Sequence, residues 1–340
     1  EKRLCDYVDD KRQYGCAVTS EMCQLKALAI AKQLGIMGFK ASRGWLTRFF
    51  NRNGLGFWRK TSIAQRLPGD YEEKVVNFHR YVINLRREHS YMLSQIGNAD
   101  QMPVYFEMPL DNTVNRKGES SVMIRTGGNE KQRCTVMLCI TGDGRKLPPY
   151  VIFKRKTIPK VSVKGVLVRA NPKGWMDNDL VVDWVTHVWQ RRPGTLLNLR
   201  NMLVLDSFRG HTTQEVRQKL QKGKTDLVII PGGLTSVLQP LDVCINRPFK
   251  AALKQRYTQW MADDKREFTQ SGKIKRPDVT RICEWVKCAW DSIPLPLVEK
   301  SFKKCGITNS LDGTEDDALW EDGDDNNDFS ASDDDESDDE

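Results

Sequence analysis

The sequence has no long apolar run, no paired-cysteine motif and few histidines. No apolar stretch approaches the roughly 20 residues that span a bilayer, and we find no signal-peptide pattern. The nine cysteines include no CxxC pair, and there are only four histidines, so zinc-ligand spacing is missing. The odd, scattered cysteines predict free thiols in a reducing compartment. Because the chain begins with Glu1 rather than methionine, we expect a piece of a longer protein.

Two stretches lack charges of one sign. From Met22 to Gly69 there is no Asp or Glu, whereas the segment from Asp312 to Glu340 holds 16 acidic residues and no Lys or Arg. The net charge of +8 therefore hides a basic body, because residues 1–311 carry 53 basic and 29 acidic residues. A basic body with an acidic tail is typical of a protein whose partner is a polyanion, most often nucleic acid. A merely lysine-rich solvated surface is the alternative interpretation.

Residues 1–67 are predicted to form a helical unit. One helix is expected after a cap at Thr19 or Ser20, and a second after a cap at Ser42, with Gly54 ending it. Aromatic residues at helical spacing on the second helix are interpreted as core. Two helices without acids are typical of a helix-turn-helix motif, whose second helix enters the major groove of DNA. The predicted DNA-binding residues are Lys40, Arg43, Arg48, Arg52, Arg59 and Lys60.

Apolar stretches between residues 98 and 260 predict a mixed β-sheet. Thr135–Ile140 and Tyr150–Phe153 flank a Gly-Asp-Gly turn, so we expect an antiparallel hairpin. Two later strands, Met202–Leu205 and Leu227–Ile230, alternate with predicted helices. Strands that first pair antiparallel and then alternate with helices predict an α/β fold with helices on both faces of the sheet.

The chain of 340 residues is longer than one typical domain. After the helical unit we expect a helical connector over residues 68–97, formed by one helix from Asp70 to about Gly97. The sheet domain is predicted to cover residues 98–311. The acidic segment 312–340 has few apolar residues and is predicted to be mostly disordered. We also expect this tail to fold back on the basic body and weaken nonspecific DNA binding.

Three aspartates stand beside the apolar stretches. Asp206 closes the run Met202–Leu205, Asp100 precedes a predicted strand at Val104–Phe106, and Asp242 follows another apolar stretch. A carboxylate at the end of a buried strand is usually paired, hydrogen-bonded or bound to a metal, because burying it alone is costly. Asp206 taken alone is also consistent with a helix N-cap or a hydrogen-bonded strand end. Three carboxylates gathered by one sheet would suit a pair of divalent cations for phosphoryl transfer.

Several sequence blocks resemble one family of proteins. The blocks Asn98-Ala-Asp-Gln-Met-Pro-Val-Tyr-Phe, Leu203-Val-Leu-Asp-Ser-Phe-Arg-Gly-His and Pro231-Gly-Gly-Leu-Thr-Ser-Val-Leu-Gln-Pro-Leu-Asp-Val resemble the catalytic blocks of the pogo branch of the Tc1/mariner transposases. The block Gly38-Phe-Lys-Ala-Ser-Arg-Gly-Trp-Leu-Thr-Arg-Phe is similar to the DNA-binding region shared by pogo elements and centromere protein B. The resemblance covers about residues 1–318.

The resemblance implies a ribonuclease-H-like fold, preceded by an all-α helix-turn-helix unit, and cut-and-paste DNA transposition. It also implies that Asp100, Asp206 and Asp242 form a catalytic triad, called DDE or DDD in this family, that binds two Mg²⁺ or Mn²⁺ ions. His211 follows the second block, and we interpret it as a structural residue rather than a catalytic one.

Three functions remain open from the sequence. The first is a nuclear, sequence-specific DNA-binding protein that was domesticated from a transposase, as in the vertebrate class with an upstream KRAB repressor module, and that regulates transcription or chromatin. The second is an active metal-dependent endonuclease or strand transferase. The third is a protein–protein scaffold. We expect double-stranded DNA as a partner, a homodimer and chromatin or repressor proteins as further partners, and no membrane.

Overall fold

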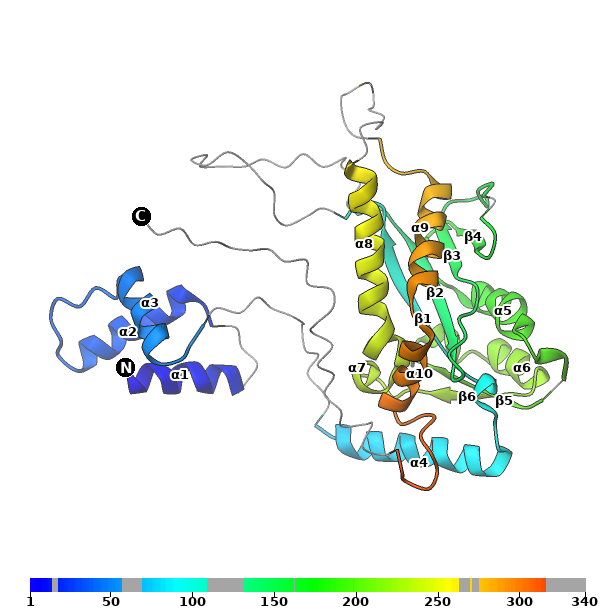
Figure 1. Ribbon diagram of the computed structural model, residues 1–340, viewed down its shortest axis with the longest axis horizontal. Coiled ribbons are helices and arrows are strands. Elements are labelled where there is room, and N and C mark those ends of the chain that lie inside the picture. Colours follow the sequence, from blue (N-terminus) through cyan, green and yellow to red (C-terminus); the bar gives the residue numbers. More distant parts are fainter. Residues whose placement is uncertain are drawn as a thin grey trace. The chain divides into compact units, whose positions relative to one another are not determined.

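The computed structural model describes residues 1–13, 18–56, 69–108, 131–161, 163–197, 199–262, 270 and 275–315. The chain divides into two compact units, which we call the helical unit, Glu1–Arg66, and the sheet unit, from Leu67 onward. Each unit is described by itself (Figure 1). None of the helices in these ranges is long and apolar enough to cross a membrane.

The helical unit contains α1 (Lys2–Gln13), α2 (Ser20–Gln33) and α3 (Arg43–Arg52). The hydroxyl oxygens of Thr19 and Ser42 cap α2 and α3 by accepting hydrogen bonds from the backbone N–H groups of Met22 and Trp45. These caps and both predicted helices are confirmed. The three helices share a small core whose buried members are Leu4, Cys23, Ala27, Ala41, Leu46 and Phe49.

The sheet unit begins with α4 (Tyr71–His89) and contains a six-stranded sheet. Its strands are β1 (Ile96–Tyr105), β2 (Arg133–Thr141), β3 (Tyr150–Lys154), β4 (Leu167–Asn171), β5 (Asn201–Leu205) and β6 (Thr225–Ile229). The order is β4-β3-β2-β1-β5-β6. Pairs β1–β2 and β2–β3 are antiparallel, whereas β3–β4, β1–β5 and β5–β6 are parallel. The predicted hairpin and the mixed sheet are therefore confirmed.

Helices cover both faces of the sheet (Figure 1). The helices are α5 (Asn178–His187), α6 (Gln214–Lys222), α7 (Thr235–Leu238), α8 (Asn246–Ala262), α9 (Val279–Ser292) and α10 (Leu295–Lys304). On one face α8, α9 and α10 bury large aromatic side chains such as Phe249, Trp290 and Phe302. On the other face α5 and α6 pack over a second core that includes Trp184. Burying apolar surface on both faces explains why the central strands are continuous apolar runs.

The structure corrects the prediction for the start of the sheet. The helix expected from Asp70 to Gly97 ends at His89, and β1 already begins at Ile96, so Asp100 lies inside the strand rather than before it. The strand tolerates Pro103 because β1 pairs with β5 only through Ile96–Asn98, which leaves one side of the strand unpaired at the proline.

Two further differences concern β4 and the end of the chain. Strand β4 was not predicted from the sequence; it is a half-buried five-residue strand at the edge of the sheet with an arginine at its centre. The apolar residues between positions 278 and 309 predict one helical segment, which in the structure consists of two helices, α9 and α10, because Pro294 stands at the break and cannot continue α9.

Candidate active site

The pairing of β1 with β5 brings two of the three aspartates together. Residues Ile96–Asn98 pair in parallel with Met202–Val204, and continuing that register sets Asp100 beside Asp206. Asp206 directly follows the last residue of β5. The third aspartate, Asp242, lies in a π-helical turn, Leu241–Ile245, that leads into α8. Such π-helical turns occur often at functional sites.

A buried amide pair holds the Asp242 turn against the sheet. Asn98 and Gln239 are both completely buried. The Asn98 side-chain nitrogen donates hydrogen bonds to the Val204 carbonyl oxygen at 3.0 Å and to Gln239 Oε1 at 2.9 Å. In return, Asn98 Oδ1 accepts a hydrogen bond from the Leu241 backbone N–H at 3.2 Å. Because buried polar groups are costly unless paired, this network fixes the turn relative to β1 and β5.

Asn246 joins two of the carboxylates. It lies one helical turn after Asp242, and its side-chain nitrogen donates hydrogen bonds to Asp100 Oδ2 at 3.0 Å and to Asp242 Oδ1 at 2.7 Å. Asp100 Oδ1 accepts a further hydrogen bond from the Gln101 backbone N–H at 2.7 Å. The two carboxylates therefore point toward one position, which the amide nitrogen of Asn246 occupies.

The third carboxylate is held by a buried histidine. The His211 side chain is 1% exposed, and its Nδ1 lies 2.7 Å from Asp206 Oδ1. The other ring nitrogen, Nε2, lies 2.9 Å from the side-chain nitrogen of Gln101. If the Gln101 amide donates there, His211 is neutral with its proton on Nδ1, so that it donates to Asp206. This geometry supports the interpretation of His211 as a structural residue.

The pKa values of the three carboxyl groups diverge. Burial raises the pKa of Asp100 to about 7, and repulsion from Asp242 adds to the rise. The pKa of Asp242 is also raised, and the main cause is again the partial removal of the carboxyl group from water, although part of this side chain is exposed. Burial acts in the same direction on Asp206, but hydrogen bonds from His211 and from the Phe208 backbone N–H outweigh it and hold the Asp206 pKa below its usual value.

The donor set suits a hard divalent cation, because carboxylate oxygens are the ligands that Mg²⁺ and Mn²⁺ prefer. Asp100 and Asp242 converge on one point, and the charge of Asp242 raises the pKa of Asp100, so a cation would relieve their repulsion. Among the described residues, however, no three His, Cys, Asp or Glu side chains lie close enough to hold a single ion. The residues thus fit a cation chemically, with two carboxylates brought together and the third held aside by His211.

The predicted DNA-binding residues of the helical unit are exposed where the structure describes them. Arg43 is the first residue of α3, Arg48 projects from its middle, and Lys40 lies in the segment before the helix. Arg52, at the end of α3, forms an ion pair with Glu1 at 2.6 Å. The remaining two predicted residues, Arg59 and Lys60, lie outside the described residues.

Four amide side chains of the site were not predicted from the sequence: Asn98, Gln101, Gln239 and Asn246. Two of them carried a signal in their spacing. Asn98 is two residues before Asp100 and therefore on the same face of the strand, and Asn246 is four residues after Asp242 and therefore one helical turn away. The pairing of Asn98 with Gln239 depends on the fold and has no local signal.

A mixed sheet with carboxylates at its central strands and at the start of a following helix defines the ribonuclease-H-like class of nucleases and transposases. Residues 131–302 match the family described as DDE superfamily endonuclease, and residues 1–58 match the Tc5 transposase DNA-binding domain. The chain therefore belongs to the DDE superfamily of endonucleases. The first matched range includes Asp206 and Asp242 but begins after Asp100.

Relatives of known sequence include transposase-derived proteins of mammals. The chain is 42% identical over 324 residues to the human protein "Pogo transposable element with KRAB domain", covering 94% of this chain and 53% of that protein. The mouse protein of the same name is 40% identical over 324 residues, again covering 94% of this chain and 53% of that protein. The human "Pogo transposable element with ZNF domain" is 29% identical over 76% of this chain and 18% of that protein. The chain thus spans about half the length of the first two relatives.

Solved transposase structures share the fold. The Mos1 strand transfer complex has a TM-score of 0.58 at 12% identity, covering 90% of this chain and 74% of that one. The Mos1 transposase paired-end complex with left transposon end also has a TM-score of 0.58, at 11% identity, covering 95% and 78%. These matches confirm the ribonuclease-H-like fold expected from the resemblance.

Proposed function

We propose that this chain binds duplex DNA in a sequence-specific manner through its helical unit. The observation that carries this proposal is the exposed basic side of α3, where Arg43 and Arg48 lie opposite the buried Leu46 and Phe49. Lys and Arg side chains on one helix face contact phosphates, while neighbouring residues of the helix read base edges in the major groove. The match to a transposase DNA-binding domain over residues 1–58 supports it.

The experiment compares the chain with the variant Arg43→Ala with Arg48→Ala in binding to a library of random duplexes. We expect the unaltered chain to enrich a common sequence and the variant to lose both the enrichment and part of the salt dependence of its affinity. Lys164→Gln with Lys222→Gln, two exposed lysines of the sheet unit, serves as the control. Equal enrichment by the variant would contradict the proposal and would favour the protein–protein scaffold.

A second proposed function is metal-dependent cleavage or strand transfer of DNA phosphodiesters at Asp100, Asp206 and Asp242. The convergence of Asp100 and Asp242 on one point favours it, because two like charges aimed at one point repel each other unless something compensates them. A Mos1 paired end complex with Mn, of similar fold at a TM-score of 0.54, supports divalent cation use. When bound by these carboxylates, Mg²⁺ or Mn²⁺ would activate a nucleophile and stabilise a leaving oxygen.

The chain's own residues have separate tasks in this reaction. The lowered pKa of Asp206 keeps its carboxylate ionised at neutral pH, and His211 fixes one of its oxygens, so the other is available to a ligand. Asn246 keeps Asp100 and Asp242 aimed at one point. The buried pair of Asn98 and Gln239 holds the Asp242 turn in place.

Calorimetric titration with Mn²⁺, on the chain and on Asp206→Asn, followed by a plasmid nicking assay, tests this second function. Micromolar to millimolar binding that disappears in the variant, together with nicking, is the expected result. An absence of binding in both proteins would mean that the carboxylate centre is no longer active, and the DNA-binding role would stand alone.

The cellular role we propose is that of a nuclear regulator of transcription or chromatin, domesticated from a pogo-type transposase. Two similar proteins carry a KRAB domain in their names, which supports a role with repressor proteins. Homodimerisation and binding to chromatin proteins belong to the same proposal. A nuclear-fraction measurement of the tagged full-length protein tests the location.

A further inference from the structure

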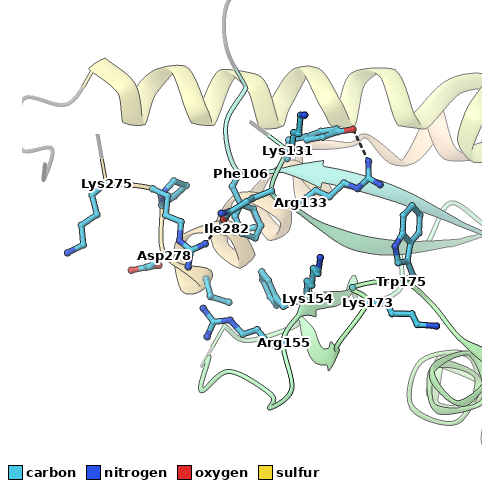
Figure 2. A pocket seen from close by; sticks show the side chains of 17 residues that line it. Phe106, Lys131, Arg133, Lys154, Arg155, Lys173, Trp175, Lys275, Asp278 and Ile282 are labelled. Carbon is cyan, nitrogen blue, oxygen red and sulfur yellow. Dashed lines mark hydrogen bonds between the residues drawn. The ribbon is translucent and has the colours of Figure 1, made fainter. Parts of the chain in front are cut away.

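A basic pocket lies where β1 ends and β2 begins, away from the carboxylates. Figure 2 shows the side chains that line it. Its cavity volume is about 980 Å³. The lining residues come from the ends of β1, β2 and β3, from the segment after β4 and from the segment before α9. Seven of the lining side chains are Lys or Arg, and only Asp278 is acidic. The pocket therefore concentrates positive charge from four separate parts of the chain.

Three of these cations, Lys154, Arg155 and Lys173, have no ion-pair partner among the described acidic side chains. The Asp278 side chain caps α9 by accepting a hydrogen bond from the Arg281 backbone N–H at 2.7 Å. Lys154, Arg155 and Lys173 are all exposed. A concave surface with uncompensated cations attracts a polyanion, because its low-dielectric walls focus the electric field.

Two guanidinium groups of the pocket are held in place. The Arg133 guanidinium donates to the Tyr105 hydroxyl at 3.1 Å and lies over the Trp175 ring, 4.8 Å from its centre. Arg276 donates to the Gln132 side-chain oxygen. An arginine that is already ordered loses less side-chain entropy when it binds a phosphate. The Trp175 ring is 58% exposed and forms a flat apolar wall beside these cations.

The distance from the carboxylates suits a nucleic-acid strand. Asp100 and Tyr105 stand on the same strand, five residues apart, which corresponds to about 17 Å at the usual rise of an extended chain. At about 3.4 Å per nucleotide along one DNA strand, this is the length of about five nucleotides. A DNA strand that reaches the carboxylates is therefore long enough to place a later phosphate in the pocket.

We propose that the basic pocket binds the phosphodiester backbone of duplex DNA about five nucleotides away from the carboxylate centre. This inference rests on the proposed DNA-binding function and adds a second phosphate contact site to it. Lys154 and Lys173 supply exposed charges, and Arg133 supplies an ordered one. The chain also carries an acidic segment, residues 312–340, and an acidic peptide is the alternative occupant that the test must separate.

The test measures the salt dependence of the affinity of the full chain for a random 40-base-pair duplex by fluorescence anisotropy. Each phosphate contact adds about 0.9 to the slope of log affinity against log salt, which is about 5-fold in affinity at 0.15 M salt. Lys154→Gln with Lys173→Gln should therefore lower the slope by about two and the affinity by about 30-fold. The control Lys164→Gln with Lys222→Gln changes two exposed lysines outside the pocket. It should leave the salt slope and the affinity for duplex unchanged.

Two further arms separate the possible failures. If the unaltered chain binds duplex and Arg43→Ala with Arg48→Ala weakens it, but the pocket variant keeps its slope, the pocket proposal is wrong and the DNA-binding function stands. If the unaltered chain does not bind duplex at all, the proposed function itself fails. A synthetic peptide of residues 312–340 completes the test: weaker peptide binding by the pocket variant, with an unchanged duplex slope, would assign the pocket to an acidic peptide instead.

Discussion

The helical unit and the sheet unit arrange their charged residues in opposite ways. In the helical unit the arginines of α3 are exposed and the core beneath them is small and uncharged. In the sheet unit, Asp100 and Asp206 are partly buried beside two large cores, and amide side chains hold the carboxylates in position. Exposed charges cost the fold little, whereas buried carboxylates need partners. The helical unit can therefore change its contact residues freely, but the carboxylate centre is tied to the fold.

The largest expected effect comes from the difference in core size. Phe49 is completely buried in the helical unit, and Phe302 is completely buried in the sheet unit. Replacing either by alanine should cost about 3–5 kcal/mol. That cost approaches the whole stability of a unit as small as Glu1–Arg66, at about 0.1 kcal/mol per residue. Phe49→Ala should thus unfold the helical unit, whereas Phe302→Ala should leave the larger sheet unit folded.

Amide hydrogen exchange followed by mass spectrometry separates these outcomes. In Phe49→Ala the amides of α2 and α3 should lose protection while those of β5 keep it. In Phe302→Ala both sets should stay protected. Protection of α3 that survives Phe49→Ala would show that this unit is more stable than its core predicts, and the comparison between the units would have to be revised.

A smaller effect concerns the amide pair beneath the carboxylates. Asn98→Leu should destabilise the sheet unit by about 3 kcal/mol, because Gln239 Oε1 and the Leu241 N–H lose their buried partner. The double variant Asn98→Leu with Gln239→Met should cost less than the two single variants together, because it leaves fewer buried polar groups unpaired. Urea unfolding measures all three. Strict additivity would contradict the role of this pair as one unit.

The charged surface of the helical unit was predictable from sequence, whereas the details of the carboxylate site were not. The caps at Thr19 and Ser42 and the acid-free window are local signals, and the described helices follow them. The antiparallel hairpin and the apolar strand before Asp206 were equally local. In each case neighbouring residues in the chain decide the structure.

The rest of the site depends on contacts between distant segments. Asn98 and Gln239 are 141 residues apart in sequence, so no local pattern announces their hydrogen bond. The early start of β1 at Ile96 was missed because the apolar residues before it continue the period of a helix, while pairing with β2 and β5 draws them into the sheet. Tertiary pairing overrode local propensity at this point.

The smallest expected effect tests whether Asn246 stands in for a cation. Asn246→Ala removes hydrogen bonds to Asp100 and Asp242, and because Asp242 is partly exposed we expect a loss of only about 1 kcal/mol in the metal-free protein. Without the amide, repulsion between the carboxylates is relieved only by a cation, so the rise in melting temperature on adding Mn²⁺ should be larger than in the unaltered chain. In Asp100→Asn, the matched control, that rise should shrink. If Asn246→Ala instead reduced the Mn²⁺ effect, the side-chain oxygen of Asn246 would be a cation ligand, and the amide would belong to the metal site rather than occupy its place.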